Sequence, residues 1–174
     1  PAQGTTSGAD MLFYALENGY SAYSWNSSTE DARRKIRSGV PVIVLQQNSG
    51  RDRSGHYRVL TGYDDSERKF YVMDPYYDDR TEMGYDECER LWSPMGHWAL
   101  LIVPADKDRF AEDLGLANPV LHMDLSYAKF KRKDYEDALK EALLALRLEP
   151  RNSYARSLVG KIQTAIGAGR HAGE

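Results

Sequence analysis

The sequence has little cysteine, no long apolar run and little net charge, and each shortage excludes a class of protein. Its 174 residues include a single cysteine, Cys88, which excludes an internal disulfide and a zinc site built on several thiolates. The longest apolar runs, such as Trp98–Val103, fall far short of the roughly 20 residues that cross a bilayer, so we expect no membrane span. The net charge of −3 gives no basic footprint for nucleic acid.

The start of the sequence also lacks expected features. The stretch PAQGTTSGAD contains neither an initiator methionine nor the charged and apolar regions of a signal peptide. We therefore expect a domain, a processed form or a fragment. With 41% hydrophobic and 28% charged residues, the composition is typical of a soluble globular protein.

Four short runs rich in β-branched and aromatic residues predict strands: Val40–Gln47, His56–Tyr63, Lys69–Asp74 and Trp98–Pro104. The polar stretch DDSER joins the second run to the third, which predicts an antiparallel hairpin. Capping and stop signals predict helices within residues 7–20 and 28–39, and a further helix over Tyr85–Trp92. Residues 1–104 are therefore expected to form an α+β domain with a mainly antiparallel sheet.

Residues 105–174 carry a helical pattern instead. Apolar residues at helical spacing run from Tyr135 to Leu148, and Pro150 ends the helix. The spacing of Ala138, Ala142 and Ala145 before this proline resembles a tetratricopeptide repeat, in which small residues let two helices approach closely. Such repeats serve as scaffolds for a protein or peptide partner, although about three are needed for an independent solenoid. The alternative is a helical cap packed on the sheet domain.

The predicted hairpin should bring a histidine and an aspartate together. His56 follows Gly55 at the start of one strand, and Asp74 ends the strand predicted to pair with it. A lone histidine beside a strand is more often structural than catalytic. Here, however, a carboxylate could accept the imidazole Nδ1–H and fix its tautomer, which is the orienting half of a nucleophile–base–acid triad.

The order of these elements resembles a papain-like cysteine peptidase domain of the double-glycine, bacteriocin-processing type. The stretches that carry the resemblance cover about the first hundred residues: GTTSGADMLFYALENGYSAYSW, SSTEDARRKIRSGVPVIVLQQ, GHYRVLTGYDD, FYVMDPY, YDECERLW and WALLIVP. The resemblance implies that His56 is the general base and that Asp74 orients it. The cysteine of the family, which lies in a Cys-Gly-Pro-like motif after an oxyanion-hole glutamine, has no counterpart, because Gln3 is not followed by a cysteine.

Other candidate residues are given structural roles. Cys88 is flanked by Asp86, Glu87 and Glu89, and carboxylates raise the pKa of a thiol, so we expect a buried apolar residue rather than a nucleophile. His97 is expected to be structural. The acidic stretch DPYYDDRTEMGYDE lacks the ligand pattern of an EF-hand and is expected to be a solvated loop. No metal or cofactor site is predicted.

The sequence thus predicts a peptidase-like domain that has a general base and an orienting acid but no recognisable nucleophile in this chain. The expected ligand is a peptide or protein, and the helical region is expected to hold a protein partner. The chain alone is predicted to be inactive. If an N-terminal segment is missing, exposed apolar surface should favour self-association. The alternatives are a catalytically inactive peptide-binding or protein-binding module and a helical adaptor.

Overall fold

The computed structural model describes residues 6–77, 81–114 and 117–171, which divide into two compact units. The sheet unit comprises residues 19–113. The helical unit combines the segment before residue 19 with the segment from Leu114 onward. Helix α1 (Gly8–Glu17) therefore packs with the C-terminal helices, whereas the sequence groups it with residues 1–104. The domain boundary at residue 104 stays a prediction.

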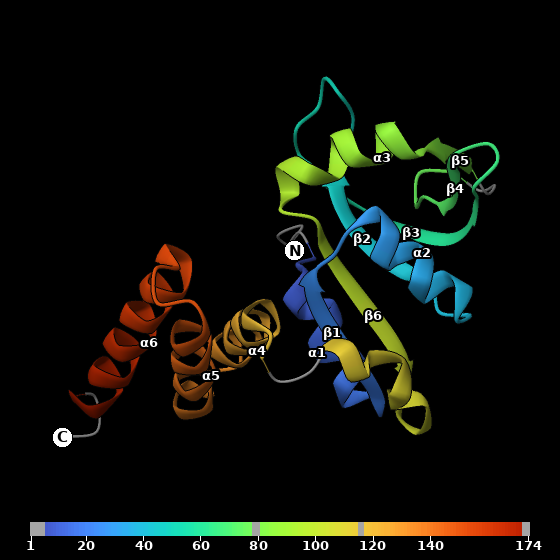
Figure 1. The fold of residues 1–174 in the computed structure, drawn as a ribbon. Coiled ribbons are helices and arrows are strands. Elements are labelled where there is room, and N and C mark those ends of the chain that lie inside the picture. The colour runs from blue at the N-terminus through green and yellow to red at the C-terminus, as the bar shows by residue number, and fades with distance from the viewer. Residues whose placement is uncertain (1–5, 78–80, 115–116, 172–174) are drawn as a thin grey trace. The chain divides into compact units, whose positions relative to one another are not determined.

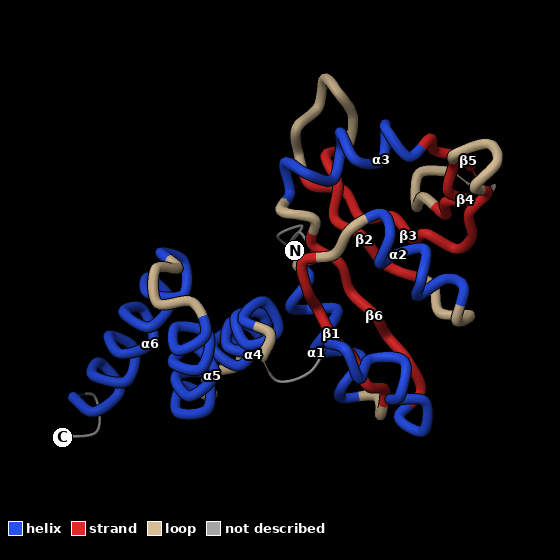
Figure 2. Tube along the Cα trace, viewed as in Figure 1, coloured by secondary structure: helices blue, strands red, loops and turns tan. Residues whose placement is uncertain are grey.

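The sheet unit is built on a six-stranded antiparallel sheet with the strand order β1-β6-β2-β3-β4-β5 (Figures 1 and 2). Its strands are β1 (Tyr20–Asn26), β2 (Val42–Gln47), β3 (Gly55–Asp64), β4 (Lys69–Met73), β5 (Thr81–Gly84) and β6 (Trp98–Pro104). The expected fold class is confirmed in its architecture: the chain is α+β, with an antiparallel sheet and a helical C-terminal region. The two outermost strands were not predicted, because β1 is rich in serine and β5 is four residues long.

The β3–β4 hairpin is formed as predicted. Its polar turn is held by Asp64, whose carboxylate accepts hydrogen bonds from the backbone N–H groups of Ser66 and Glu67 at 2.9 and 3.2 Å. The two strands pair with Val59 opposite Met73, and the register shifts between Leu60 and Gly62. This register places the beginning of β3 beside the end of β4.

Two helices contact the central strands of the sheet. Helix α2 (Thr29–Arg37) begins at Ser28, whose hydroxyl accepts the backbone N–H of Asp31 at 3.1 Å, and ends before Gly39, whose φ of +86° is accessible to glycine. Helix α3 (Tyr85–Trp92) leads into the short 3₁₀ helix η1 (Ser93–Met95). A second 3₁₀ segment, η2 (Ala105–Leu114), follows β6. The buried core of the sheet unit includes Val42, Val44, Leu60, Phe70, Val72, Trp92 and Leu100.

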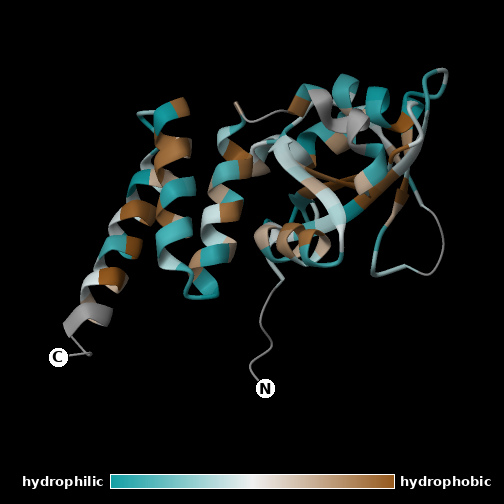
Figure 3. Cartoon of the chain, turned by 90° about the horizontal axis from the view of Figure 1, so that it is seen from below, coloured by the Kyte–Doolittle hydropathy of each residue, from teal (hydrophilic) through white to brown (hydrophobic). Residues whose placement is uncertain are grey.

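The helical unit contains α1, α4 (Pro119–Lys131), α5 (Tyr135–Leu148) and α6 (Ser153–His171). Hydrophobic and hydrophilic residues alternate along its last helices (Figure 3). Ala138 and Ala142 are fully buried with Leu158 and Ile162 between α5 and α6, so the small residues do fill a helix interface. The tetratricopeptide-like character of this region stays a prediction.

Ion pairs join the first helix to the fourth. Lys131 Nζ lies 2.7 Å from Asp10 Oδ1, and the two terminal guanidinium nitrogens of Arg132, Nη1 and Nη2, donate to the Glu17 carboxylate at 2.6 and 2.5 Å. The Arg132 guanidinium also lies 4.0 Å from the centroid of the Phe13 ring, an arrangement that adds cation–π attraction. These contacts explain why α1 belongs with the helices. Among the residues described, no helix is both long and apolar enough to span a membrane.

Candidate active site

The two predicted site residues meet at one end of the β3–β4 hairpin. His56 is the second residue of β3, and Asp74 directly follows β4. Both are buried, with exposed fractions of 8% and 5%, and His56 Nε2 lies 2.8 Å from Asp74 Oδ1. The predicted pairing of these side chains is therefore confirmed.

The nitrogen that makes this bond differs from the expectation. We expected Asp74 to accept the Nδ1–H of the imidazole, but the bond is made by Nε2. Extending the register of Val59 and Met73 by one residue puts Asp74 opposite Arg58, so His56 is a diagonal neighbour on the same face of the sheet. Nε2 is the ring nitrogen farther from the backbone, which suits the longer diagonal reach.

The sequence DPYY shapes the turn that aims the carboxylate. The backbone N–H of Tyr77 donates to the Asp74 carbonyl at 3.0 Å, and the N–H of Tyr76 donates to Asp74 Oδ1 at 3.0 Å. Pro75 lies at the second position of this turn, where its fixed φ is favourable. The Tyr76 ring stacks on the His56 imidazole with a centroid distance of 4.6 Å and an interplanar angle of 9°. One short motif thus positions both members of the pair.

Arg58 is a site residue that the sequence analysis missed. Its Nε donates to Asp74 Oδ2 at 2.7 Å, and its exposed fraction is 7%. Its terminal nitrogens donate to the Gln46 side chain and the Gln47 carbonyl, both at 3.3 Å, and to the Asn48 carbonyl at 2.8 Å. Strand periodicity could have found it, because residues two apart in β3 share a face.

The surroundings of Asp74 favour its ionised form. Burial by itself raises the pKa of this carboxyl group, but the backbone N–H of Tyr76 and the side chains of His56 and Arg58 donate to it and more than compensate. The pKa of Asp74 therefore lies below its ordinary value. The group is a carboxylate at neutral pH and can accept the imidazole N–H.

Cys88 lies in α3 and is completely buried. Gln46 Nε2 donates to its sulfur at 3.2 Å and to its carbonyl oxygen at 3.3 Å. Burial raises the pKa of the thiol to about 12, the hydrogen bond from Gln46 opposes this, and the neighbouring Glu89 and Glu87 add to it. The flanking carboxylates act in the expected direction, although burial is the larger cause. This thiol is poorly suited to nucleophilic attack.

Two further regions noted in the sequence have structural partners. His97 Nε2 lies 2.7 Å from Glu89 Oε1, and its ring meets Trp92 edge-on with centroids 5.4 Å apart. In the acidic stretch expected to be a loop, residues Thr81–Gly84 instead form β5, which pairs with β4. Residues 78–80 of that stretch and Gln3 lie outside the described residues.

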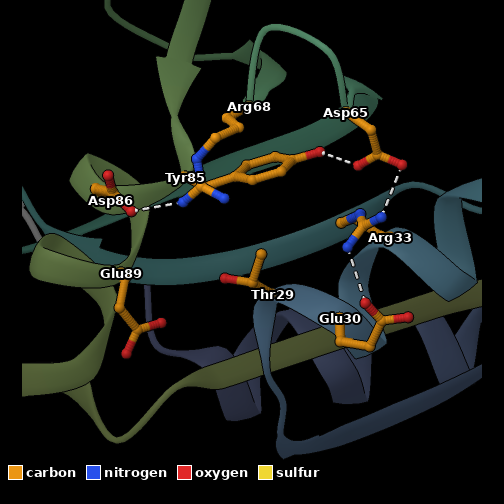
Figure 4. A pocket seen from close by; sticks show the side chains of 8 residues that line it. All are labelled: Thr29, Glu30, Arg33, Asp65, Arg68, Tyr85, Asp86 and Glu89. Carbon is orange, nitrogen blue, oxygen red and sulfur yellow. Dashed lines mark hydrogen bonds and ion pairs between the residues drawn. The ribbon is translucent and has the colours of Figure 1, made fainter.

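A cavity of about 590 Å³, separate from the His56–Asp74 pair, lies between α2 and α3 (Figure 4). It is lined by Thr29, Glu30, Arg33, Asp65, Arg68, Tyr85, Asp86 and Glu89. Its charged groups largely bind one another: Arg33 pairs with Glu30 and Asp65, and Arg68 pairs with Asp86. Because Arg33 and Arg68 already have carboxylate partners, this cavity is a weaker candidate for a functional site than the His56–Asp74 pair. In the described residues no group of three or more His, Cys, Asp or Glu side chains is placed to hold a metal ion.

Comparison with known proteins assigns the family. Residues 3–100, more than half of the chain, match the model of the Peptidase_C39 like family. The chain therefore belongs to this family, and the suspected relationship to C39-type peptidases is confirmed at that level.

Among solved structures, the chain is similar to the peptidase domain of Streptococcus ComA, described as a bi-functional ABC transporter involved in a quorum-sensing pathway. The two are 21% identical, with a TM-score of 0.47, over 60% of this chain and 70% of that chain. No protein in the curated set matches the chain.

Proposed function

We propose that the sheet unit supplies the general base and the orienting carboxylate of a cysteine-peptidase site, His56 and Asp74 respectively. The observation that carries this proposal is the buried 2.8 Å contact between His56 Nε2 and Asp74 Oδ1. Membership in the Peptidase_C39 like family supports it, because the family resemblance gives these two positions those roles. The ligand class is a peptide or a protein.

The geometry suits this chemistry. When Asp74 accepts a hydrogen bond from the Nε2–H group, the neutral imidazole carries its lone pair on Nδ1, the nitrogen that must receive a thiol proton. The thiolate then attacks the peptide carbonyl, the C–N bond breaks as the imidazolium protonates the leaving amine, and water releases the acyl group. In this scheme Asp74 stabilises the imidazolium and fixes the ring.

The nucleophile separates two versions of the proposal. Cys88 is buried and its pKa is raised to about 12, so in the first version the reactive thiol comes from polypeptide other than these 174 residues. In the second version, the sheet unit binds peptides without cleaving them. The coding sequence upstream of Pro1 distinguishes the two. A glutamine followed by Cys-Gly-Pro ahead of a helix supports the peptidase, and a start codon directly before Pro1 supports the binding module.

The chain itself provides a biochemical test. We expect no cleavage when the 174-residue protein is incubated with a peptide panel and the products are analysed by mass spectrometry, because His56 and Asp74 cannot form an acyl-enzyme without a thiol. The Cys88→Ala variant serves as the control. Cleavage that this substitution abolishes would show that Cys88 is the nucleophile and that our assignment of the site is wrong.

For the helical unit we propose a contact with another protein, in the first instance a second copy of this chain. Leu144 and Leu148 lie one turn apart on α5 and remain 37% and 39% exposed, and exposed leucines on one helical face favour association. Light scattering over a concentration series tests this. Mass should increase with concentration in the wild type and less so after Leu144→Ser with Leu148→Ser. Leu16→Ser, at an exposed leucine of α1, is the matched control. A monomer at every concentration contradicts self-association.

A further inference from the structure

We propose that Arg58 is a positioning residue of this site, which holds Asp74 ionised and aimed at His56. The inference rests on the proposed roles of His56 and Asp74. The hydrogen bonds of Arg58 go to Asp74, Gln46, Gln47 and Asn48 and not to the imidazole. Its effect on His56 is therefore exerted through the Asp74 carboxylate.

The two carboxylate oxygens of Asp74 are divided between different partners. Oδ1 accepts hydrogen bonds from His56 Nε2 and the backbone N–H of Tyr76, at 2.8 and 3.0 Å. Oδ2 accepts from Arg58 Nε at 2.7 Å. With both oxygens bound, the carboxylate cannot rotate about its Cβ–Cγ bond without breaking a short hydrogen bond. Arg58 therefore fixes the direction in which Oδ1 points.

The other end of the guanidinium is anchored to a different strand. Its terminal nitrogens donate to the carbonyl oxygens of Gln47 and Asn48 and to the side-chain oxygen of Gln46. These residues lie at the end of β2, where the loop leading to Gly55 and His56 begins. A planar guanidinium presents its donors in a rigid fork, whereas a lysine ammonium is a point donor on a flexible stem. The fork of Arg58 links the Asp74 carboxylate to the end of β2 through separate nitrogens, which the single ammonium nitrogen of a lysine does not reproduce.

The charge of Arg58 has a second consequence. Asp74 and Arg58 are 5% and 7% exposed, and a buried carboxylate without a cationic partner tends to take up a proton. A protonated Asp74 would no longer be a charged acceptor for the His56 N–H. The backbone N–H of Tyr76 and the His56 side chain lower the pKa of Asp74 more than Arg58 does. Arg58 adds a charge that does not depend on the protonation of His56, because a guanidinium stays charged at all ordinary pH values.

The inference is tested by NMR on the whole chain with two substitutions, Arg58→Met and Arg58→Lys. The first readout is the ¹³C titration of the Asp74 carboxyl group. We expect Arg58→Met to raise the pKa of Asp74 by about 1–3 pH units, the usual effect of losing an opposite charge at this distance. Arg58→Lys should raise it less, because it keeps the charge. Arg68→Met, which removes an exposed arginine paired with Asp86, is the matched control and should leave Asp74 unchanged.

The second readout is the low-field proton resonance of the His56 Nε2–H, which reports the bond to Asp74. Both Arg58 variants should shift or broaden it, including Arg58→Lys, which keeps the charge but loses the fork. An arginine that merely stabilised the fold would not move this signal in a folded variant. If Arg58→Met does not fold, Arg58→Lys still provides the decisive spectrum.

The Asp74→Asn variant separates failure of the inference from failure of the proposed function. If Asp74→Asn removes the wild-type resonance while folded Arg58 variants leave both readouts unchanged, the role of Arg58 is refuted and the His56–Asp74 pair stands. If the resonance survives Asp74→Asn, the pair itself is refuted and the proposed function fails with it.

Discussion

The thiol of Cys88 should be almost inert towards alkylating reagents while the protein is folded. Cys88 is the only cysteine in the 174 residues, so every modification by a thiol reagent reports on this one side chain. It is fully buried in α3 against Gln46. The protein is treated with iodoacetamide in buffer and, for comparison, in concentrated urea.

The expected slowing of the alkylation follows from the ionised fraction of the Cys88 thiol, because the thiolate is the reactive species. An ordinary pKa of 9.0 leaves about a tenth of a thiol ionised at pH 8, whereas burial of Cys88 raises its pKa to about 12 and leaves about one part in ten thousand. Ionisation alone therefore slows the reaction of the folded protein about 1000-fold. Reaction through global unfolding offers no faster route, since a stability of about 5 kcal/mol or more leaves at most about 2 × 10⁻⁴ of the molecules unfolded.

The rate of alkylation is followed by mass spectrometry as the increase in protein mass. The Cys88→Ser variant, which has no thiol, gives the background modification of other residues. The pH dependence separates the two routes. Reaction within the folded state accelerates about tenfold per pH unit well beyond pH 9, because the folded thiol ionises far above that pH. Reaction through unfolded molecules levels off near pH 9. Complete labelling of the native protein at pH 7, at the rate seen in urea, would refute the assignment of Cys88 as a buried structural residue.

Three other substitutions test the site and the helical unit. The pKa of Asp74 is lowered in the folded protein, so ionised Asp74 stabilises the fold above the ordinary carboxyl pKa, and this stabilisation is lost as the pH falls through the pKa of the folded state. Asp74→Asn should therefore reduce the decline of the unfolding free energy below about pH 4, measured by urea denaturation. Tyr76→Ala should speed the modification of His56 by diethylpyrocarbonate several-fold, as mapped by mass spectrometry, because it removes the stacked ring. Tyr76→Phe and Tyr77→Ala should not speed it. Equal rates in all variants would show that the stacked ring gives no protection. Ala142→Leu should lower the unfolding free energy by about 1–3 kcal/mol by overpacking a fully buried helix contact; an unchanged denaturation midpoint would contradict the close packing.

The elements with strong local signals were predictable from the sequence. Ser28 and Gly39 delimit α2 because a hydroxyl cap and a left-handed glycine act within a few residues. The hairpin followed from two β-rich runs and a short polar turn. Strands β1 and β5 were missed because their stability comes from pairing with β6 and β4 rather than from their own residues. The packing of α1 against α4 could not be read from sequence, because it depends on ion pairs between residues more than a hundred positions apart.

The candidate site shows the same division between local and long-range information. His56 and Asp74 were found because each stands at a strand end, and the hairpin brings those ends together. The diagonal placement of His56 and Asp74 follows from the register of β3 and β4, which shifts between Leu60 and Gly62 and which the sequence does not reveal. Arg58 was overlooked because an arginine in a strand is ordinarily a solvent-exposed residue. Strand periodicity places Arg58 on the same face as His56, but its partners are identified only when Asp74 and the end of β2 are placed around it.

The polar groups at the site are satisfied without help from a nucleophile. Asp74 is bound by His56, Arg58 and Tyr76, and Arg58 is bound in turn by Asp74 and the end of β2. A buried network whose members all have partners is stable in itself, so the integrity of the pair is expected in an active peptidase and in an inactive binding module alike. The two versions of the proposed function are therefore expected to have the same stability at this pair and to differ in reactivity. The distinction must come from reactivity: whether a thiol presented to His56 is activated, and from which part of the polypeptide that thiol comes.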